Sequence, residues 1–115
     1  MTSIPKLPYF STEDYAKGVK VSIVNVQAEG KQCTPFEVSR IVIAPNTWTP
    51  MDQHEVKECW FISSGNGLLE YDGKEPVSVG AGDVLLYDSQ HSHRIYNAGV
   101  DDLVVFSLWW SDVKS

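Results

Sequence analysis

The feature that most limits the fold of this chain is a series of short β-forming stretches that recur along most of its length. These stretches are rich in aromatic and β-branched residues, several alternate apolar with polar positions, and Gly, Pro, Asp and Asn separate them. No convincing long run has the 3.6-residue period of an amphipathic helix. About eight such stretches at regular spacing predict an all-β sandwich or barrel. The predicted strands are 19–27, 36–44, 59–64, 68–72, 76–79, 84–87, 91–97 and 103–110.

The length of the chain supports one domain built from these strands. A chain of 115 residues can bury one core but is too short for two. We expect an N-terminal arm over residues 1–18, extended over the domain or a partner subunit, with a one-turn helix starting at Ser11. A single barrel is expected over residues 19–110 and a frayed tail over residues 111–115.

Charge and composition limit the partners of the protein. The formal net charge is -6 and no Lys/Arg cluster is present, which argues against nucleic acid and anionic membranes as partners. We find no signal-peptide pattern at the N-terminus and no stretch near the roughly 20 apolar residues of a membrane span. Cys33 and Cys59 have neither metal-site spacing nor the density of a secreted disulfide scaffold. These features predict a cytoplasmic protein with two reduced thiols.

Two potential metal ligands, His54 and Glu58, stand just before the predicted strand at 59–64. On a helix, this i, i+4 pair would share one face, as in an ordinary surface contact or a zinc-binding helix. Pro50 and the β-forming residues downstream argue instead for an extended chain. Residues of equal parity then point to one face, provided that no bulge intervenes. That face would carry a polar cluster followed by an apolar wall: Asp52, His54, Glu58, Trp60 and Ile62.

Glycine-containing turns are predicted on both sides of the strand at 68–72. Gly65-Asn66-Gly67 can supply the positive φ angles of a hairpin that joins 59–64 to 68–72. Asp72-Gly73 is a second turn signal, leading to the short strand at 76–79.

Two runs of residues resemble the two sequence motifs of the cupin superfamily. Between the runs lie residues 66–81, close in length to the short inter-motif segment of small bacterial members. The resemblance covers about residues 38–108 and implies a double-stranded β-helix, the jelly-roll barrel of a small single-domain cupin. The first run, Asn46-x5-Asp52-x-His54-x3-Glu58-x6-Gly65, is similar to G-x5-H-x-H-x3or4-E-x6-G, and the second, Gly82-x5-Asp88-x-Gln90-x2-His93-x3-Asn97, to G-x5-P-x-G-x2-H-x3-N.

The chain departs from the family pattern at four positions. Asn46 replaces a glycine, a mild change because asparagine tolerates left-handed φ. Asp88 and Gln90 replace the proline and glycine of a turn, at little functional cost. Asp52 replaces the first histidine of the pattern, which is the most serious difference because that position is a metal ligand in the family.

Carried over position by position, the resemblance implies a metal site made of Asp52, His54, Glu58 and His93. Two histidines and a carboxylate suit Fe(II), Mn(II), Co(II), Ni(II) or Zn(II), and Asp52 can add a fourth ligand. The two carboxylates favour Fe(II) or Mn(II) as the single divalent ion. The alternative is a hydrogen-bonded loop network without metal, in which His54 or His93 would serve as an acid or base.

Three further residues are candidates for substrate binding. Trp60 follows Glu58 by two positions and is expected to form a pocket wall. Arg40 is a charged residue on an otherwise apolar strand face, where it needs either a substrate anion or an internal acidic partner. His91 lies in a turn and is expected at the rim, contacting substrate rather than binding metal.

These features predict a metal-dependent enzyme that acts on a small polar metabolite by metal-assisted proton transfer. Isomerisation, epimerisation, dehydration, another lyase reaction or cyclisation would all fit, with Asp52, His54 and His93 as catalytic residues. The alternatives are a non-haem Fe(II) dioxygenase and a non-catalytic ligand-binding cupin. A homodimer is also predicted, because the N-terminal arm and the apolar last strand would offer edges for pairing.

Overall fold

The computed structural model describes residues 6–111, and within this range the chain forms strands and no helix. None of the described residues therefore belongs to a helix that could cross a membrane. The strands are β1 (Tyr9–Ala16), β2 (Val19–Val24), β3 (Gln27–Ala28), β4 (Lys31–Gln32), β5 (Glu37–Ile43), β6 (Lys57–Ser64), β7 (Asn66–Tyr71), β8 (Val77–Gly80), β9 (Val84–Tyr87), β10 (His93–Asn97) and β11 (Leu103–Trp110).

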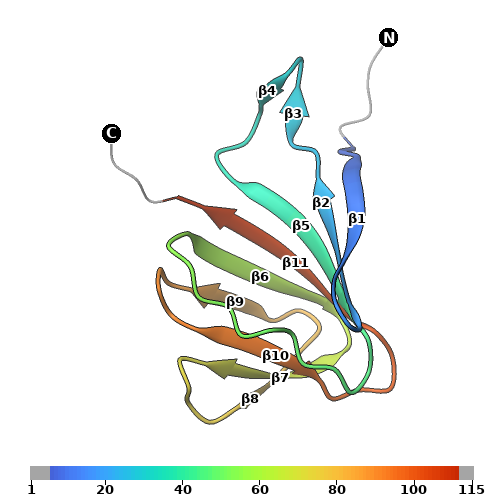
Figure 1. Ribbon diagram of the computed structural model, residues 1–115, viewed down its shortest axis with the longest axis vertical. Helices are drawn as coiled ribbons and strands as arrows, with labels where there is room; N and C mark the ends of the chain where they lie inside the picture. The colour runs from blue at the N-terminus through green and yellow to red at the C-terminus, as the bar shows by residue number, and fades with distance from the viewer. Residues whose placement is uncertain (1–5, 112–115) are drawn as a thin grey trace.

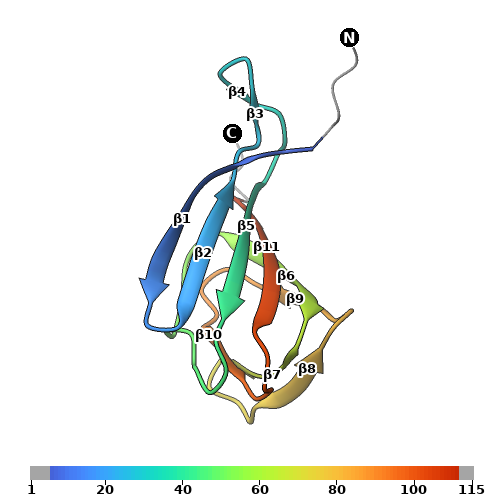
Figure 2. The same ribbon diagram turned by 90° about the vertical axis from the view of Figure 1, so that its right-hand side faces the viewer.

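The strands form two main sheets and one small projecting hairpin. The larger sheet has the order β1-β2-β5-β11-β6-β9, and the smaller has the order β10-β7-β8. In Figures 1 and 2 the smaller sheet lies beside one end of the larger sheet, and the β3-β4 hairpin projects from the other end. This arrangement is a jelly-roll β barrel, so the fold class predicted from the sequence is confirmed.

Alternation along the central strands places one set of side chains inside the barrel. In β5 the residues at 39, 41 and 43 are buried, whereas their neighbours in the strand are partly exposed. Both sheets contribute apolar side chains to the core, and their burial is the main contribution to the stability of the fold, at roughly 25 cal/mol per Å² of apolar surface. The core consists of Val19, Ile41, Ile43, Trp60, Ile62, Val79, Tyr87, Ile95, Leu103 and Val105.

The prediction of a separate arm over residues 1–18 is wrong for its second half. Residues 9–16 are strand β1, which pairs with β2 in antiparallel register and forms an edge of the larger sheet. No helix starts at Ser11, which is paired with Ile23 inside this strand. Gly18, with a φ of 77°, makes the tight turn to β2, and this turn brings the arm back into the sheet. Residues 1–5 of the predicted arm and 112–115 of the predicted tail lie outside the described residues.

The prediction of a hairpin between 59–64 and 68–72 is also wrong. Strand β6 pairs with β11 and β9, whereas β7 pairs with β10 and β8, so the chain changes sheets at Gly65. Gly65 has a φ of 95°, and a Cβ there would lie 2.9 Å from the backbone oxygen of Asp102 and 2.9 Å from Cα of Leu103. Glycine is therefore required for a close crossing between sheets and not for a two-strand turn.

Other local predictions agree with the structure. The Asp72-Gly73 turn joins β7 to β8, with φ angles of 58° and 73°. Asn46 adopts a left-handed φ of 57°, as expected for asparagine at a glycine position. Strand β11 matches the predicted last strand at 103–110, but it lies between β5 and β6 and is not an edge. The edges of the larger sheet are β1 and β9.

Candidate metal centre

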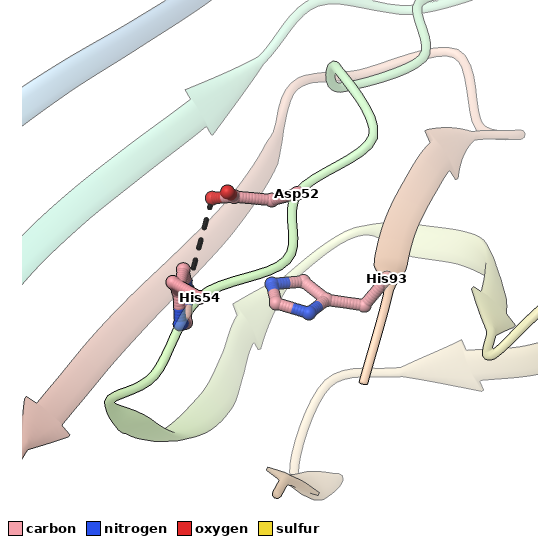
Figure 3. Close-up of side chains that lie close together, drawn as sticks. All are labelled: Asp52, His54 and His93. Atoms are coloured by element: carbon pink, nitrogen blue, oxygen red, sulfur yellow. Dashed lines mark ion pairs between the residues drawn. The ribbon is translucent and has the colours of Figure 1, made fainter. Parts of the chain in front are cut away.

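The candidate ligands come from one loop and two strands. Asp52 and His54 lie on the segment between β5 and β6, Glu58 lies in β6, and His93 begins β10. Figure 3 shows Asp52 and His54 on the same loop, with His93 approaching from the strand opposite. Asp52 and His93 form an isolated antiparallel bridge, in which each backbone N–H donates to the other's carbonyl oxygen at 3.0 Å and 2.9 Å. This bridge brings together residues 41 positions apart in the sequence.

The ligand atoms of these residues converge on a small volume. Asp52, His54 and His93 each offer one ligand atom within 4.8 Å of the others. Glu58 Oε1 lies 3.0 Å from His54 Nε2 and 3.2 Å from His93 Nε2. Asp52 Oδ2 is more distant, at 3.8 Å from His54 Nε2. The structure therefore brings together all four residues that the sequence suggested as ligands, with Asp52 at the outer side.

The backbone orients both imidazole rings toward this volume. His54 Nδ1 lies 3.1 Å from the carbonyl oxygen of Val56, and His93 Nδ1 lies 3.3 Å from that of His91. A carbonyl oxygen only accepts, so an imidazole that hydrogen-bonds through Nδ1 donates from that nitrogen. Each Nε2 then faces the Glu58 carboxylate, which also only accepts, so a second proton or a cation is needed between them. A hydrogen bond of this kind to Nδ1 is how proteins orient histidine ligands of metals.

This arrangement fits a divalent cation. Nitrogen and oxygen ligands lie about 2.1 Å from such an ion, so two ligands at a right angle are about 3.0 Å apart. Both distances to Glu58 Oε1 match this spacing. Protonation of His54 would satisfy its own contact with Glu58, but the buried His93 Nε2, 3.2 Å from Glu58 Oε1, would still need a proton of its own. A cation would satisfy both imidazoles at once, whereas one added proton satisfies only one.

Glu58 is held ionised by its surroundings. It is 7% exposed, and Oε2 accepts hydrogen bonds from Trp60 Nε1 at 2.7 Å and from the Ser107 hydroxyl. Burial raises the pKa of Glu58, but the polar contacts with His93, Ser107 and Trp60 outweigh burial and lower the pKa to about 2. Oε2 is occupied by these two donors, which leaves Oε1 free to face the imidazoles.

A cavity of about 400 Å³ opens beside the four residues. It is large enough for a small-molecule ligand. Its polar end carries Asp52, His54, Glu58 and His93, and most of the remaining wall is apolar. The other lining residues are Glu13, Tyr15, Val19, Val21, Ile23, Ser39, Ile41, Thr49, Pro50, Val56, Trp60 and Trp109.

Of the three predicted substrate-binding residues, Trp60 lines the cavity, whereas Arg40 and His91 do not. Trp60 lines the cavity, as its parity with Glu58 suggested. Arg40 is absent from the lining, because Ser39 and Ile41 occupy the inner face of β5 and Arg40 points to the opposite face. His91 is also absent from the lining: its ring stacks on Tyr71 at 5.5 Å, and Nδ1 lies 3.2 Å from Asp72 Oδ2. Only its carbonyl oxygen reaches the site, through His93.

Sequence reasoning missed two groups near the site. Glu13 and Tyr15 of β1 line the cavity, but they were not predicted there because residues 1–18 were interpreted as an arm. Their alternate spacing, together with the turn at Gly18, was the signal that would have placed them on one face of a strand. Tyr87 was predicted only as the last residue of the strand at 84–87, yet its ring stacks on His93 at 4.0 Å and 9° and fixes the plane of that imidazole.

Comparison with known proteins agrees with this geometry. Residues 39–110, more than half of the chain, match the cupin domain family. The chain belongs to the cupin family. A curated relative, the oxalate-binding protein of Thermotoga maritima, is 36% identical over 66 residues, which are 56% of this chain and 54% of that protein. The match therefore spans about half of the relative's length.

Solved structures share the fold of this cupin. A cupin 2 conserved barrel domain protein from Salinispora arenicola has a TM-score of 0.78 at 20% identity, covering 96% of this chain and 92% of that one. A predicted oxalate decarboxylase from Thermotoga maritima has a TM-score of 0.72 at 23% identity, covering 92% and 94%. At these identities the likeness concerns the fold alone.

Proposed function

We propose that this cupin binds one divalent metal ion through His54, Glu58 and His93 and acts on a small molecule in the adjoining cavity. The observation that supports the ligand set is the convergence of two imidazole Nε2 atoms on Glu58 Oε1 at 3.0 Å and 3.2 Å. His93 Nε2 is buried and has no polar contact beyond the one with Glu58 Oε1 at 3.2 Å, and a shared cation would satisfy both atoms. Two carboxylates near the ion favour Fe(II) or Mn(II) over softer metals.

The proposed reaction class is metal-assisted proton transfer, as in isomerases, epimerases, dehydratases and cyclases. A bound divalent ion would polarise a carbonyl or hydroxyl oxygen of the substrate. Asp52 is then the group that takes or returns the proton, because its side chain is 46% exposed and lies at the outer side of the ligand cluster. His54 and His93 hold their Nδ1 protons on backbone carbonyls and keep their rings in position. Trp60 and the apolar wall exclude water from the reacting atoms.

The ligand assignment is tested by metal analysis of purified variants. We expect one equivalent of divalent ion in the natural protein and an affinity reduced at least about 100-fold in His54→Ala and His93→Ala. His91→Ala is the matched control: it removes the remaining histidine, whose ring does not line the cavity, and its metal content should be unchanged. Equal metal content in all four proteins would rule out the proposed site.

The role of Asp52 is tested separately. Asp52→Asn preserves the shape of the side chain and removes its charge. If Asp52 transfers protons, this variant keeps its metal with an affinity within about threefold of the natural protein. A loss as large as that of His54→Ala would instead make Asp52 a fourth ligand.

The second candidate function is a non-haem Fe(II) dioxygenase. Two histidines and one carboxylate are the donor set used by such enzymes. Oxygen uptake by the iron-loaded protein in the presence of substrate, absent with Mn(II) or Zn(II), would favour this reaction. Stable ligand binding without turnover under all these conditions would favour a non-catalytic cupin.

We also propose a homodimer and retain the cytoplasmic location as a prediction. The support for the dimer is β1, an edge strand that exposes Tyr9 and Phe10 at 46% and 58%. Light scattering of the purified protein measures the mass directly. A monomer at micromolar concentration would contradict the proposal.

A further inference from the structure

The wall of the cavity carries negative charge and no positive side chain. Three carboxylates line it, those of Glu13, Asp52 and Glu58, and none of the described lining residues is Lys or Arg. The field of Asp52 and Glu58 reaches across the cavity to β1: burial and these two carboxylates raise the pKa of Tyr15. The cavity is therefore acidic on both of its sides.

The body of the cavity is apolar. Most of the residues away from the ligand cluster are aliphatic or aromatic, and Trp109 and Trp60 supply two large ring surfaces. Ile23 and Val21 of β2 continue this surface toward the β1 edge. A ligand that fills about 400 Å³ must place most of its surface against these groups.

A bound metal ion does not reverse the charge of the wall. On the proposed function, a divalent ion offsets two of the three carboxylates, and the imidazoles stay neutral. The lining then keeps one negative charge, and the formal net charge of the whole chain is -6. An anion entering this cavity meets repulsion from Glu13 and Asp52, and the charge of the ion is balanced by Glu58 and Asp52 together.

We propose that the ligand of this cavity is a small molecule with an apolar body and a neutral or positively charged head, and not a dicarboxylate such as oxalate. This inference rests on the proposed function for the position of the head, which lies at the polar end of the cavity beside Asp52, a half-exposed carboxylate that is not a proposed ligand. The apolar body lies against Trp60, Trp109 and the β2 side chains. The Thermotoga relative is named an oxalate-binding protein, and oxalate is an anion. The negative charge of the wall predicts a different kind of ligand for this chain.

The test compares three ligands with the same six-membered carbon ring and different heads: cyclohexylmethylamine, cyclohexylmethanol and cyclohexanecarboxylate. Oxalate is the fourth probe. Binding to the metal-loaded protein is followed by tryptophan fluorescence, since Trp60 and Trp109 line the cavity, and by calorimetry. We expect the amine and the alcohol to bind at least about tenfold more tightly than the carboxylate and oxalate.

Two charge variants show whether the wall causes this preference. Glu13→Gln removes a carboxylate that lines the cavity and is not a proposed ligand, and it should reduce the amine-to-carboxylate ratio by about threefold or more. Glu75→Gln is the matched control, because it changes the net charge equally at an exposed site outside the lining, and the ratio should stay unchanged. An equal change in both variants would assign the preference to the overall charge and overturn the role of the wall.

The outcomes separate this inference from the proposed function. Carboxylate or oxalate binding as tight as that of the amine, or no binding of any ring compound, overturns the inference while the metal content stays as expected. If the natural protein binds no metal, the proposed function fails. The same four probes then report on a wall with all three carboxylates uncompensated, where the amine should exceed the carboxylate by a larger factor.

Discussion

The two halves of the candidate site differ in how firmly the fold holds them. Glu58 and His93, here called the strand half, lie in β6 and β10 and are 7% and 2% exposed. Asp52 and His54, here called the loop half, have side chains that are 46% and 29% exposed. Strand pairing places the first pair, whereas backbone hydrogen bonds to β10 and the 88–91 turn place the second.

This difference indicates a division of work within the site. A rigid half keeps ligand geometry within tenths of an ångström, which a metal ion requires. An exposed half leaves space for substrate to enter and for a proton to leave. Substitutions in one half show whether the other half responds.

The largest effect is expected where the chain crosses between the sheets. Gly65→Ala places a Cβ 2.9 Å from backbone atoms of Asp102 and Leu103 at a φ of 95°, so it should lower the free energy of unfolding by about 3 kcal/mol or more. Gly73→Ala is the control, because that glycine has a similar φ of 73° and open space around it; the expected loss is about 1 kcal/mol. Urea denaturation measures both. Equal losses would mean that backbone conformation alone, and not the crossing, requires Gly65.

The next largest effect is expected in the free energy of unfolding of chelator-treated protein, where the two histidines can be compared. His93→Ala leaves a hole beside Tyr87 and Trp60 and should cost about 2 kcal/mol, because the ring is fully buried and stacked. His54→Ala, on the loop half, should cost less than about 1 kcal/mol. Both variants should lose metal. Equal destabilisation by the two would remove the distinction between the halves.

A smaller effect is expected from the link between the loop half and the 88–91 turn. Gln53 Nε2 donates to the carbonyl oxygen of Gln90 at 2.8 Å, beside the bond from Gln90 N to His54 O. Gln53→Ala should cost about 0.5 kcal/mol in stability, since the bond is exposed, but should weaken metal binding about threefold by loosening His54. Gln27→Ala, on the β3-β4 hairpin away from the site, is the control. Metal affinity identical in the two variants would show that the loop is held by its backbone bonds alone.

The smallest effect concerns the backbone of that turn. Gln90 has a φ of 66°, a conformation that costs a residue with a side chain about 1 kcal/mol. Gln90→Gly should raise the free energy of unfolding by about 0.5 kcal/mol after the entropy cost of glycine is subtracted. Asn46→Gly should change stability less, because asparagine tolerates its φ of 57°. Thermal unfolding would detect the difference, and a decrease on Gln90→Gly would show that the glutamine side chain contributes more than the strain costs.

The sequence by itself predicted the fold class and the extent of several strands, and the resemblance to the cupin motifs supplied the four candidate ligands. Periodicity and turn residues are local signals, so Val84–Tyr87 and Leu103–Trp110 were predicted with their observed bounds. Parity placed Trp60 beside Glu58 in the cavity. The predictions of strand bounds and of side-chain parity depend only on neighbours in the chain, and short-range geometry is what a sequence encodes most directly.

Only the tertiary structure decided which strands pair and which side chains meet. Nothing local distinguishes a glycine that turns a hairpin from Gly65, which carries the chain from one sheet to the other. Likewise, Glu13 and Tyr15 complete the inner wall of the cavity only because β1 pairs with β2. Arg40 points away from this wall. Pairing between distant strands depends on the whole set of buried faces at once, and the charge of the cavity is a property of that set and of no single segment.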